Sequence, residues 1–358
     1  IERGGEFIFP SDHAIRMICA ELELPLISHE VVFNRRFMPD GSRMSVEELD
    51  HYTLTLKDTI TAMVRDGQDP SLDAAAREAY GADYVPTRLH VRLTRSYGVD
   101  PKEISARAIL HRMGEHNDFV EHLCRILNGN NSVTQEIHRR LGRDAVRFGR
   151  VVAAVEQQAG KVVFTTSDGE AFAGDAAVIA IPLPMLKRLM EGFALPELVR
   201  AAIDTSSMGA AAKISGALRS ESTPRAVQSL DGLWWTWNSA SPYGGQVGRL
   251  AVTGYAGSQH SVDRLGLQDG GKSWWNKVRA SRSDLDLCDE YVVTDWQSQP
   301  YTLGLCAGPG LGWRPELERA FDNAVGRIAF AGEHTRMSTL NGATYSGMRA
   351  AKIVRQFA

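Results

Sequence analysis

The apolar positions of this chain follow a helical period in some stretches and a strand-like period in others. Residues 11–24 place their apolar side chains on one helical face, which predicts a core helix with Ser11 or Asp12 as its N-cap. From residue 45 to about residue 129 the spacing stays helical and predicts a lobe of two or three helices. Residues 133–141 predict one more short helix.

Strand signals follow in the second half of the chain. Residues 147–155 and 161–166 are separated by turn residues and predict a small antiparallel sheet. The continuous apolar run at 176–181 predicts a strand buried on both faces, as strands of parallel sheets are. Residues 328–331 form a second apolar run, and a terminal helix follows it. The combination predicts a mixed α/β (α+β) protein.

Length and composition narrow the class of protein. A chain of 358 residues is long enough for a substantial core and favours two domains. Near-balanced charges leave a net charge of -3, which gives no indication of a nucleic-acid partner. No apolar run reaches the roughly 18 residues that a membrane helix requires, and no signal-peptide pattern begins the chain. We therefore expect a cytoplasmic protein with no membrane partner.

The cysteines are scattered along the chain without a C-x-x-C pair, at Cys19, Cys124, Cys288 and Cys306. This spacing is typical neither of a structural zinc site nor of a disulfide framework. We expect free thiols and no metal site.

The C-terminal region carries the clearest chemistry. The apolar strand at 328–331 ends in Gly332 and Glu333, and Gly342 and Ala343 stand at the start of the last helix. Glycines let a backbone approach a ligand closely, and the unpaired N–H groups of a helix start attract negative charge. The pattern suits an anionic, polyol-bearing ligand. An ordinary strand and docking helix with a solvated Glu333 is the alternative.

Two further stretches suggest a site. Lys213 stands alone among small and apolar residues at the start of a strand, where an unpaired buried ammonium would be costly. It either reaches a specific partner or extends its stem along the sheet edge. Trp234, Trp235 and Trp237 either line a pocket that accepts aromatic groups or belong to the core.

These stretches resemble the flavin-containing amine oxidase superfamily, which includes monoamine oxidases, polyamine oxidases and L-amino-acid oxidases. The resemblance rests on the Gly4-Gly5 turn near the start, the surroundings of Lys213, and the segment from Gly332 to Ala343. It implies a two-domain FAD-linked fold with a helical lobe that caps the substrate cavity. It also implies FAD-binding parts at residues 1–38, 128–190 and 311–358, the lobe at 39–127, and a substrate-binding domain at 191–310.

The resemblance also implies roles for single residues. The matching cofactor-binding positions are Gly4, Gly5, Glu6, Val152, Trp296, Gly332, Glu333, Gly342 and Ala343. In the family, a lysine at the place of Lys213 holds a water against flavin N5 and assists the reaction with oxygen. The substrate-pocket positions that match the family are Phe7, Cys306 and Thr339, and Trp235 of the tryptophan run is a further candidate for the pocket.

The chain departs from the family at the substrate pocket. Cys306 and Thr339 stand where monoamine oxidases carry two caging aromatic rings, and Phe7 stands where L-amino-acid oxidases carry a carboxylate-binding arginine. Arg35, Arg36 or another segment is the alternative source of an arginine. A cysteine next to the first cage position attaches the flavin in some relatives. Because Cys306 is one residue away from that place, we expect non-covalent FAD, with a thioether as the alternative.

The phosphate-binding G-x-G-x-x-G turn does not occur in residues 1–358. We expect a second polypeptide, either a cleavage product or a separate small subunit, to carry it in an oligomer of heterodimers. The implied activity is FAD-dependent oxidation of a C–N bond in an amine or an L-amino acid, giving an imine and hydrogen peroxide. A non-catalytic FAD-binding subunit and a desaturase-like flavoprotein are the alternatives.

Overall fold

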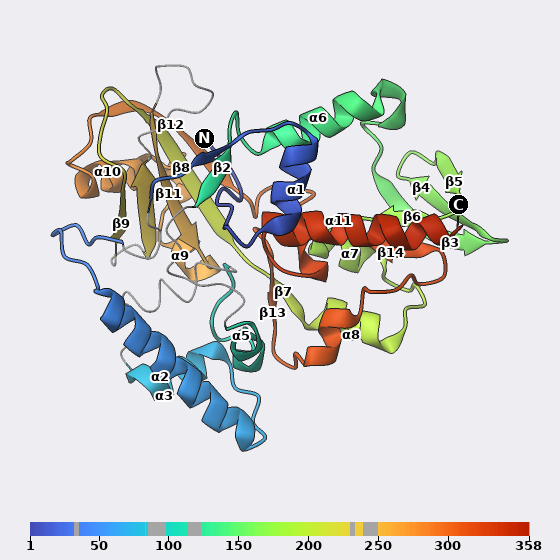
Figure 1. Cartoon of the computed structure of the whole chain (residues 1–358), viewed down its shortest axis with the longest axis horizontal. Coiled ribbons are helices and arrows are strands. Elements are labelled where there is room, and N and C mark those ends of the chain that lie inside the picture. The colour runs from blue at the N-terminus through green and yellow to red at the C-terminus, as the bar shows by residue number, and fades with distance from the viewer. Residues whose placement is uncertain are drawn as a thin grey trace.

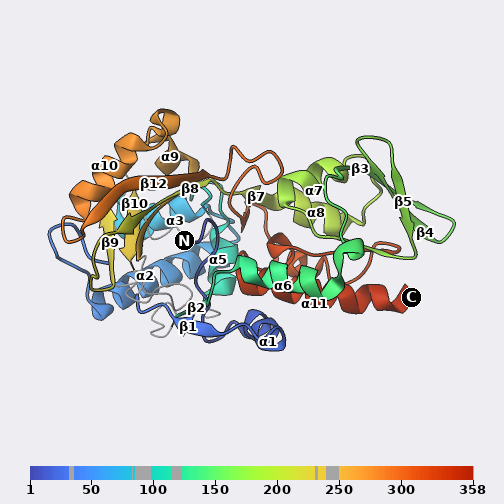
Figure 2. The same ribbon diagram turned by 90° about the horizontal axis from the view of Figure 1, so that it is seen from above.

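The computed structural model describes residues 1–31, 36–82, 84, 98–113, 123–229, 233–238 and 250–357. Figure 1 shows a five-stranded sheet at one end of the molecule, a small three-stranded sheet at the other end, and the long C-terminal helix between them. A helical lobe lies beneath the five-stranded sheet in this view, and the view from above in Figure 2 shows how elongated the molecule is.

In its described residues, the lobe contains helices α2 (Val46–Arg65), α3 (Leu72–Tyr80) and α5 (Ala106–Arg112). Each helix follows a serine whose hydroxyl accepts a backbone N–H of the first turn, and Ser45 completes a capping box with Glu48. Their apolar faces share one core that contains Ile60, Leu72 and Ile104. The predicted lobe is therefore confirmed.

The lobe ends earlier than its helical pattern predicted. Cys124–Ile126 is strand β2, which pairs antiparallel with β1 (Leu26–Ser28). The backbone of Cys124 also exchanges two 2.8 Å hydrogen bonds with Ile8. The prediction of helix through this stretch is wrong, because pairing with residues far away in the sequence outweighs the local period.

The predicted core helix near the N-terminus is α1 (His13–Glu21). The side chain that caps it comes from the other end of the chain: Asn341 Oδ1 accepts the backbone N–H groups of Ala14 and Ile15 at 2.8 and 3.2 Å. Asn341 stands at the start of α11 (Leu340–Val354), and Figure 1 shows the two helices meeting there. The N-terminal segment is thereby attached to the C-terminal helix.

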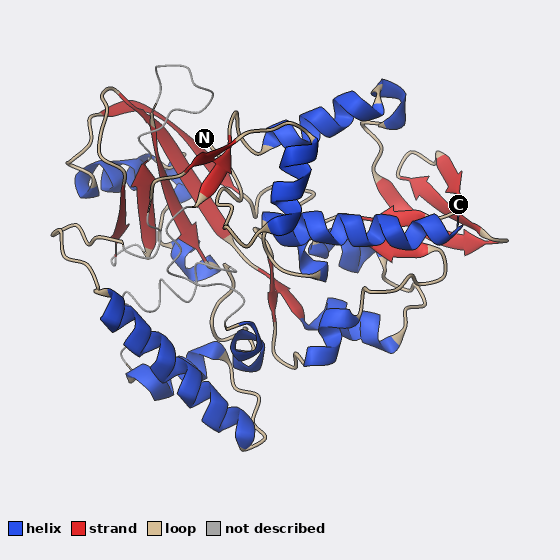
Figure 3. Cartoon of the chain, in the orientation of Figure 1, coloured by secondary structure: helices blue, strands red, loops and turns tan. Residues whose placement is uncertain are grey.

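Short strands and helices surround α11. Strands β6 (Ala177–Ile179) and β14 (Ile328–Phe330) pair in parallel, as predicted. The predicted burial of the 176–181 strand on both faces is wrong, because Val178 in β6 is 39% exposed. Figure 3 shows helices and strands mixed in this half of the molecule. The other elements here are α6 (Asn131–Leu141), β3 (Val152–Gln158), β4 (Lys161–Thr166), β5 (Ala171–Gly174), α7 (Leu183–Leu189), α8 (Glu197–Thr205), and the 3-10 turns η1 (Arg143–Ala145), η4 (Pro315–Arg319), η5 (Glu333–Thr335) and η6 (Arg355–Phe357).

The five-stranded sheet is antiparallel throughout, in the order β12-β8-β11-β10-β9. One face packs on α10, and the alternation of the strands divides the tryptophans between the two faces. Trp234 contacts the α10 side, and Trp235 and Trp237 lie on the opposite face. The elements are β8 (Ala211–Leu218), β9 (Arg225–Ser229), β10 (Trp234–Asn238), β11 (Ala251–Gly257), β12 (Leu287–Asp295), α9 (Gln259–Asp263), η3 (Leu267–Asp269), α10 (Lys272–Ser281), and the connecting pair β7 (Ser206–Met208) and β13 (Ala307–Pro309).

No helix in the described ranges is long and apolar enough to cross a membrane. Within those same ranges, no group of three or more histidine, cysteine, aspartate or glutamate side chains is arranged to hold a metal ion.

Candidate functional site

A row of four side chains crosses the sheet face that is turned away from α10. The register pairs Lys213 with Tyr255, Tyr255 with Trp235, and Trp235 with Gln228. Directly paired residues of adjacent strands point to the same face, so these four side chains lie side by side. The N-terminal segment, which begins with Glu2 and the Gly4-Gly5 turn, passes over this face.

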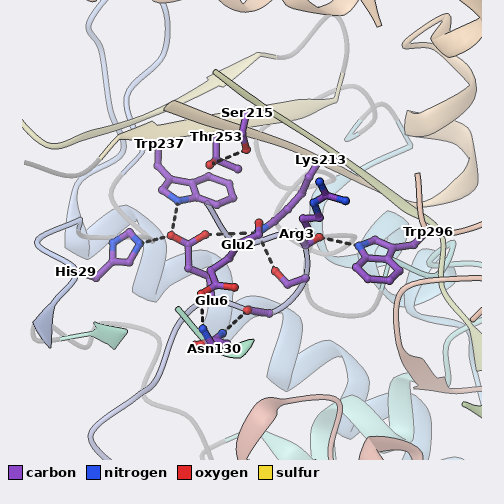
Figure 4. A network of polar contacts seen from close by, with 12 residues as sticks. Glu2, Arg3, Glu6, His29, Asn130, Lys213, Ser215, Trp237, Thr253 and Trp296 are labelled. Carbon is purple, nitrogen blue, oxygen red and sulfur yellow. Dashed lines mark hydrogen bonds and ion pairs between the residues drawn. The ribbon is translucent and has the colours of Figure 1, made fainter. Parts of the chain in front are cut away.

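Lys213 reaches that segment with its ammonium group. Its Nζ donates to the carbonyl oxygens of Glu2 at 3.0 Å and Gly4 at 2.8 Å, and it lies 3.4 Å from Glu6 Oε2 (Figure 4). Lys213 is only 6% exposed, and burial lowers the pKa of its ammonium, an effect that the Glu6 carboxylate opposes. The alternative in which the stem extends along the sheet edge into solvent is therefore wrong.

Glu6 is the buried counter-charge of Lys213. Its Oε1 accepts hydrogen bonds from His29 Nε2 at 2.8 Å and Trp237 Nε1 at 3.2 Å, while Oε2 faces the ammonium. Burial alone would raise the pKa of this carboxyl group, but Lys213, His29 and Trp237 outweigh burial and lower the pKa to about 2. The resemblance implies that Glu6 contacts the cofactor, and this contact stays a prediction.

Aromatic rings extend the site along the same face. Trp235 and Trp237 stack with ring centroids 4.2 Å apart, and Phe7 lies 6.3 Å from Trp235. The guanidinium of Arg36 lies 4.0 Å above the Trp235 ring, and its Nη1 donates to Gln228 Oε1 at 3.3 Å. Phe7 and Trp235, which were predicted to line a pocket, are thus brought together. Arg35 lies outside the described residues.

The Gly4-Gly5 turn lies between two half-buried side chains. A Cβ at Gly4 would lie 3.7 Å from the Trp296 ring, and a Cβ at Gly5 would lie 3.3 Å from Leu340. Trp296 Nε1 donates to the carbonyl oxygen of Arg3 at 2.7 Å, which fixes the indole beside the turn. The turn, Trp296 and the start of α11 are therefore neighbours, as the predicted cofactor site requires.

Asn130 holds the opposite side of the N-terminal segment. Its backbone N–H donates to Glu2 Oε1 and its side-chain amide donates to the carbonyl oxygen of Gly5, both at 2.6 Å. The segment is thus fixed between Lys213 on the sheet and Asn130 at the start of α6.

The last helix begins with a tight approach of two backbone segments. Thr339 caps α11 by accepting the Gly342 N–H at 2.9 Å, and the Thr339 carbonyl accepts the Ala343 N–H at 3.0 Å. A Cβ at Gly342 would lie 2.0 Å from the Met337 carbonyl oxygen, so a larger residue does not fit without movement of the backbone. The N–H groups before Gly342 have no acceptor within the helix and give this end a partial positive charge.

Glu333 is a nearly buried carboxyl group next to β13. Its two oxygens accept the Ala307 N–H at 3.1 and 3.2 Å. Burial raises its pKa to about 7, although hydrogen bonds from Ala307 and Ser338 oppose the rise. Gly332, just before it, has φ +127, where L side chains are strained. The alternative of a solvated Glu333 is therefore wrong.

Cys306 and Thr339 lie around the same corner of the site. Ser338 donates to the Ala307 carbonyl, which connects the residue after Cys306 to the residue before Thr339. Burial, and next the Glu333 carboxylate, raise the pKa of the Cys306 thiol well above its ordinary value. Cys306 is therefore a neutral thiol at neutral pH. In the described part of the chain, none of Cys19, Cys124, Cys288 and Cys306 forms a disulfide.

Val152 lies apart from these groups. It is 42% exposed on β3, pairs with Thr166, and belongs to the small sheet at the far end of the molecule in Figure 1. Its predicted contact with the cofactor stays a prediction, as do the roles of the other predicted residues.

The described groups fit a flat, anionic ligand with a polyol chain. The glycine turn and Trp296 offer an open backbone surface beside a ring, and the start of α11 offers N–H donors. Glu333 is a largely desolvated carboxyl group of intermediate exposure, which can accept hydrogen bonds from hydroxyl groups when ionised and donate one when protonated.

The contacts of three residues at the site could not be recognised from the sequence alone. His29 is an isolated histidine, and Asn130 belongs to the turn-rich run 128–132, which predicts a helix cap but not contact with Glu2 and Gly5. Trp237 was considered only as one of three tryptophans, although its indole N–H is the one that contacts Glu6. The alternation of side chains in a strand could have separated Trp237 and Trp235 from Trp234, because i and i+2 share a face.

Solved structures with similar folds are amine oxidases. Cyclohexylamine oxidase from Brevibacterium oxydans IH-35A superposes with a TM-score of 0.81 and 16% identity, over 99% of this chain and 88% of that one. Putrescine oxidase bound to putrescine superposes with a TM-score of 0.77 and 15% sequence identity, over 98% of this chain and 87% of that chain. The predicted FAD-linked fold is confirmed.

A curated relative agrees with the solved structures. Polyamine oxidase 3 of Oryza sativa subsp. japonica is 28% identical over 227 residues, which are 59% of this chain and 45% of that protein. The chain thus spans less than half of the length of this relative.

The whole chain can also be assigned by its sequence pattern. The pattern of the family described as flavin containing amine oxidoreductase matches residues 1–355. The family match confirms the predicted superfamily and its FAD cofactor. The chain belongs to the flavin containing amine oxidoreductase family.

Proposed function

We propose that this chain is the large chain of a two-chain oxidase that acts on a C–N bond of an amine. The observation that carries the proposal is the position of Lys213, a buried ammonium held 2.8 Å from the carbonyl oxygen of Gly4, next to Trp296 and the start of α11. Side chains of strand, turn and helix converge there, and no group that could hold a metal ion occurs among the described residues.

FAD fits the residues that converge at this place. Gly4 and Gly5 would face it with bare backbone, Trp296 would lie beside it, and the N–H groups at the start of α11 would meet its electron-rich edge. Glu333 would contact its polyol chain. When bound, FAD takes a hydride from the substrate carbon and passes the electrons to oxygen.

The protein orients the substrate through the aromatic face. Phe7 and Trp235 form an apolar cluster on the same sheet face as Lys213. Cys306 and Thr339 are smaller side chains than the two caging rings that the resemblance places at these positions. This supports a neutral amine with a bulky apolar group. An L-amino acid is the second substrate class. It is supported by Arg36, whose guanidinium lies over Trp235 and has the fork geometry that binds carboxylates.

The second polypeptide stays a proposal. Among the described residues, β14 and β6 form a parallel sheet of only two strands, and Val178 of β6 is 39% exposed. Apolar side chains are also exposed in this half of the molecule, among them Leu141, Phe148 and Val151. Both features support a strand and helix from outside residues 1–358. An active yellow preparation that contains only this polypeptide on a denaturing gel would contradict a two-chain enzyme.

The activity is tested by peroxide release across aliphatic amines, aromatic amines, polyamines and L-amino acids, with the FAD-loaded protein. We expect turnover of at least one class, and a slower reaction of the reduced enzyme with oxygen in Lys213→Met. Lys161→Met, at an exposed lysine paired with Asp175, is the control. If none of the tested amines and amino acids causes the enzyme to consume oxygen, the oxidase proposal is overturned and a non-catalytic flavoprotein is favoured. Turnover with no loss in Lys213→Met would overturn only the role of the lysine.

A further inference from the structure

We propose that Glu6 is the positioning residue of Lys213: its carboxylate keeps the ammonium charged and fixed against the Gly4-Gly5 turn. The proposal rests on the proposed oxidase function for its kinetic consequence. The structural part of the proposal is that the buried Glu6–Lys213 pair keeps Lys213 protonated. This protonation can be measured without enzyme turnover.

The hydrogen bonds of Lys213 show what Glu6 adds. The carbonyl oxygens of Glu2 and Gly4 lie at 3.0 and 2.8 Å from Nζ, closer than Glu6 Oε2 at 3.4 Å. The carbonyls are neutral dipoles, so they orient the ammonium without balancing its charge. Glu6 supplies the missing negative charge, which a buried lysine needs in order to stay protonated.

The Glu6 carboxylate is itself held by donors from two separate elements. His29, just after β1, and Trp237, on β10, both donate to Oε1. With that oxygen fixed, the remaining oxygen is directed at Lys213, as Figure 4 shows. Lys213 also lies 5.1 Å from the centre of the Trp237 ring, which adds a cation–π attraction.

Glu2 is the other acid near the ammonium, and it does not replace Glu6. Its carboxylate accepts the Asn130 N–H at 2.6 Å, and only its backbone carbonyl contacts Lys213. Burial, together with the neighbouring Glu6, raises the pKa of Glu2, so its charge is the weaker of the two. Among the described titratable groups that contact this pair, His29 donates to Glu6 rather than to Lys213.

A charged lysine at this position matters because oxygen gains negative charge as it is reduced. A positive charge that is already in place stabilises that change without reorganisation. If Glu6 is neutralised, Lys213 loses its counter-charge and either releases its proton or moves toward solvent. Glu6 would thus act on the reaction only through Lys213.

The first experiment observes the lysine directly. The FAD-loaded protein is prepared with ¹³C-labelled lysine, and the Lys213 resonance is identified by its loss in Lys213→Met. The Cε shift is then followed with pH in wild type and in Glu6→Gln. We expect Lys213 to lose its proton at least about one pH unit lower in Glu6→Gln, because an opposite charge at this range shifts a pKa by one to three units. An unchanged titration would overturn the proposal.

The second experiment is a double-variant cycle on the reaction of the reduced enzyme with oxygen. We expect Glu6→Gln to slow it roughly ten- to a hundred-fold, as loss of a preorganised charge does. In a Lys213→Met background the same substitution should have no further effect. An equal loss in both backgrounds would show that Glu6 acts independently of Lys213 and would overturn the proposal.

Two further variants keep the test decisive. Glu6→Asp retains the negative charge, so Lys213 should lose its proton at nearly the same pH as in wild type. This variant replaces Glu6→Gln in the test if Glu6→Gln does not fold. Asp175→Asn removes the acid of the exposed Lys161 pair and should change neither measurement. If no amine supports turnover, the proposed function fails, and the ¹³C titration alone decides whether Glu6 sets the state of Lys213.

Discussion

Lys213 Nζ lies 2.8 Å from the carbonyl oxygen of Gly4, although 209 positions separate them in the sequence. The bond joins strand β8 of the five-stranded sheet to the turn that approaches α11. The ammonium thereby contributes to the distance between the substrate face and the predicted flavin position.

Lys213→Met should destabilise the protein because it leaves the Glu6 carboxylate buried without its counter-charge. We expect a loss of about 3 kcal/mol in the free energy of unfolding, measured with denaturant at pH 7. The double variant Lys213→Met/Glu6→Gln should recover part of the loss, because no uncompensated charge remains. Equal stability of the single and double variants would contradict a coupled pair.

Glu6 should make stability depend on acid pH. Its folded-state pKa of about 2 lies below the ordinary value of 4.5, so the unfolded chain binds the proton more tightly. The contribution is present above pH 4.5 and is lost as the pH falls toward 2, and it amounts to about 3 kcal/mol at most. Unfolding curves between pH 6 and 3 should show a flatter pH dependence in Glu6→Gln. Parallel curves would refute the buried ionised state.

Glu333 should have the opposite effect on the pH dependence of stability. Its pKa of about 7 lies above 4.5, so the folded state binds the proton more tightly, and stability falls as the pH rises from 4.5 to 7. His334, whose pKa burial lowers to about 4, opposes this trend in wild type. The comparison therefore needs Glu333→Gln, which should gain stability relative to wild type at pH 8 by up to about 3 kcal/mol, and little at pH 5. A gain of equal size at both pH values would contradict the raised pKa.

Two glycines of α11 provide a matched pair of alanine substitutions. Gly342→Ala should cost about 1–3 kcal/mol, since its Cβ would lie 2.0 Å from the Met337 carbonyl oxygen. Gly347→Ala, in the same helix with nothing within 4 Å of its Cβ, should instead stabilise by roughly 0.5–1 kcal/mol through helix propensity. Thermal unfolding of both variants checks the pair, and FAD affinity should fall only in Gly342→Ala.

Local pattern predicted a large part of the fold. The parallel strands β6 and β14 and the helical lobe follow from periodicity and apolar runs, because each signal lies within one element. A lone lysine in an apolar strand required a partner, and Lys213 has one. The strand at Cys124–Ile126 could not be predicted this way, since its helical spacing is overridden by pairing with β1.

The same limit applies to the site. The sequence marked Glu6, Lys213 and Trp235 through motif and composition, but it could not show that Glu6 faces Lys213. That contact depends on where the N-terminal segment crosses the sheet. The contact of His29 could be recognised only from the fold, which places its Nε2 2.8 Å from Glu6 Oε1. An isolated histidine has no characteristic neighbours in the sequence.

The cap on α1 has a consequence for synthesis of the chain. Asn341 supplies the acceptor for the N–H groups of Ala14 and Ile15, yet a ribosome adds it more than three hundred residues after them. At roughly 5–20 residues per second, the first helix waits many seconds for its cap while the rest of the chain emerges. The beginning of the chain must therefore remain available for late docking, and a translating complex exposes it to chaperones until the last helix arrives.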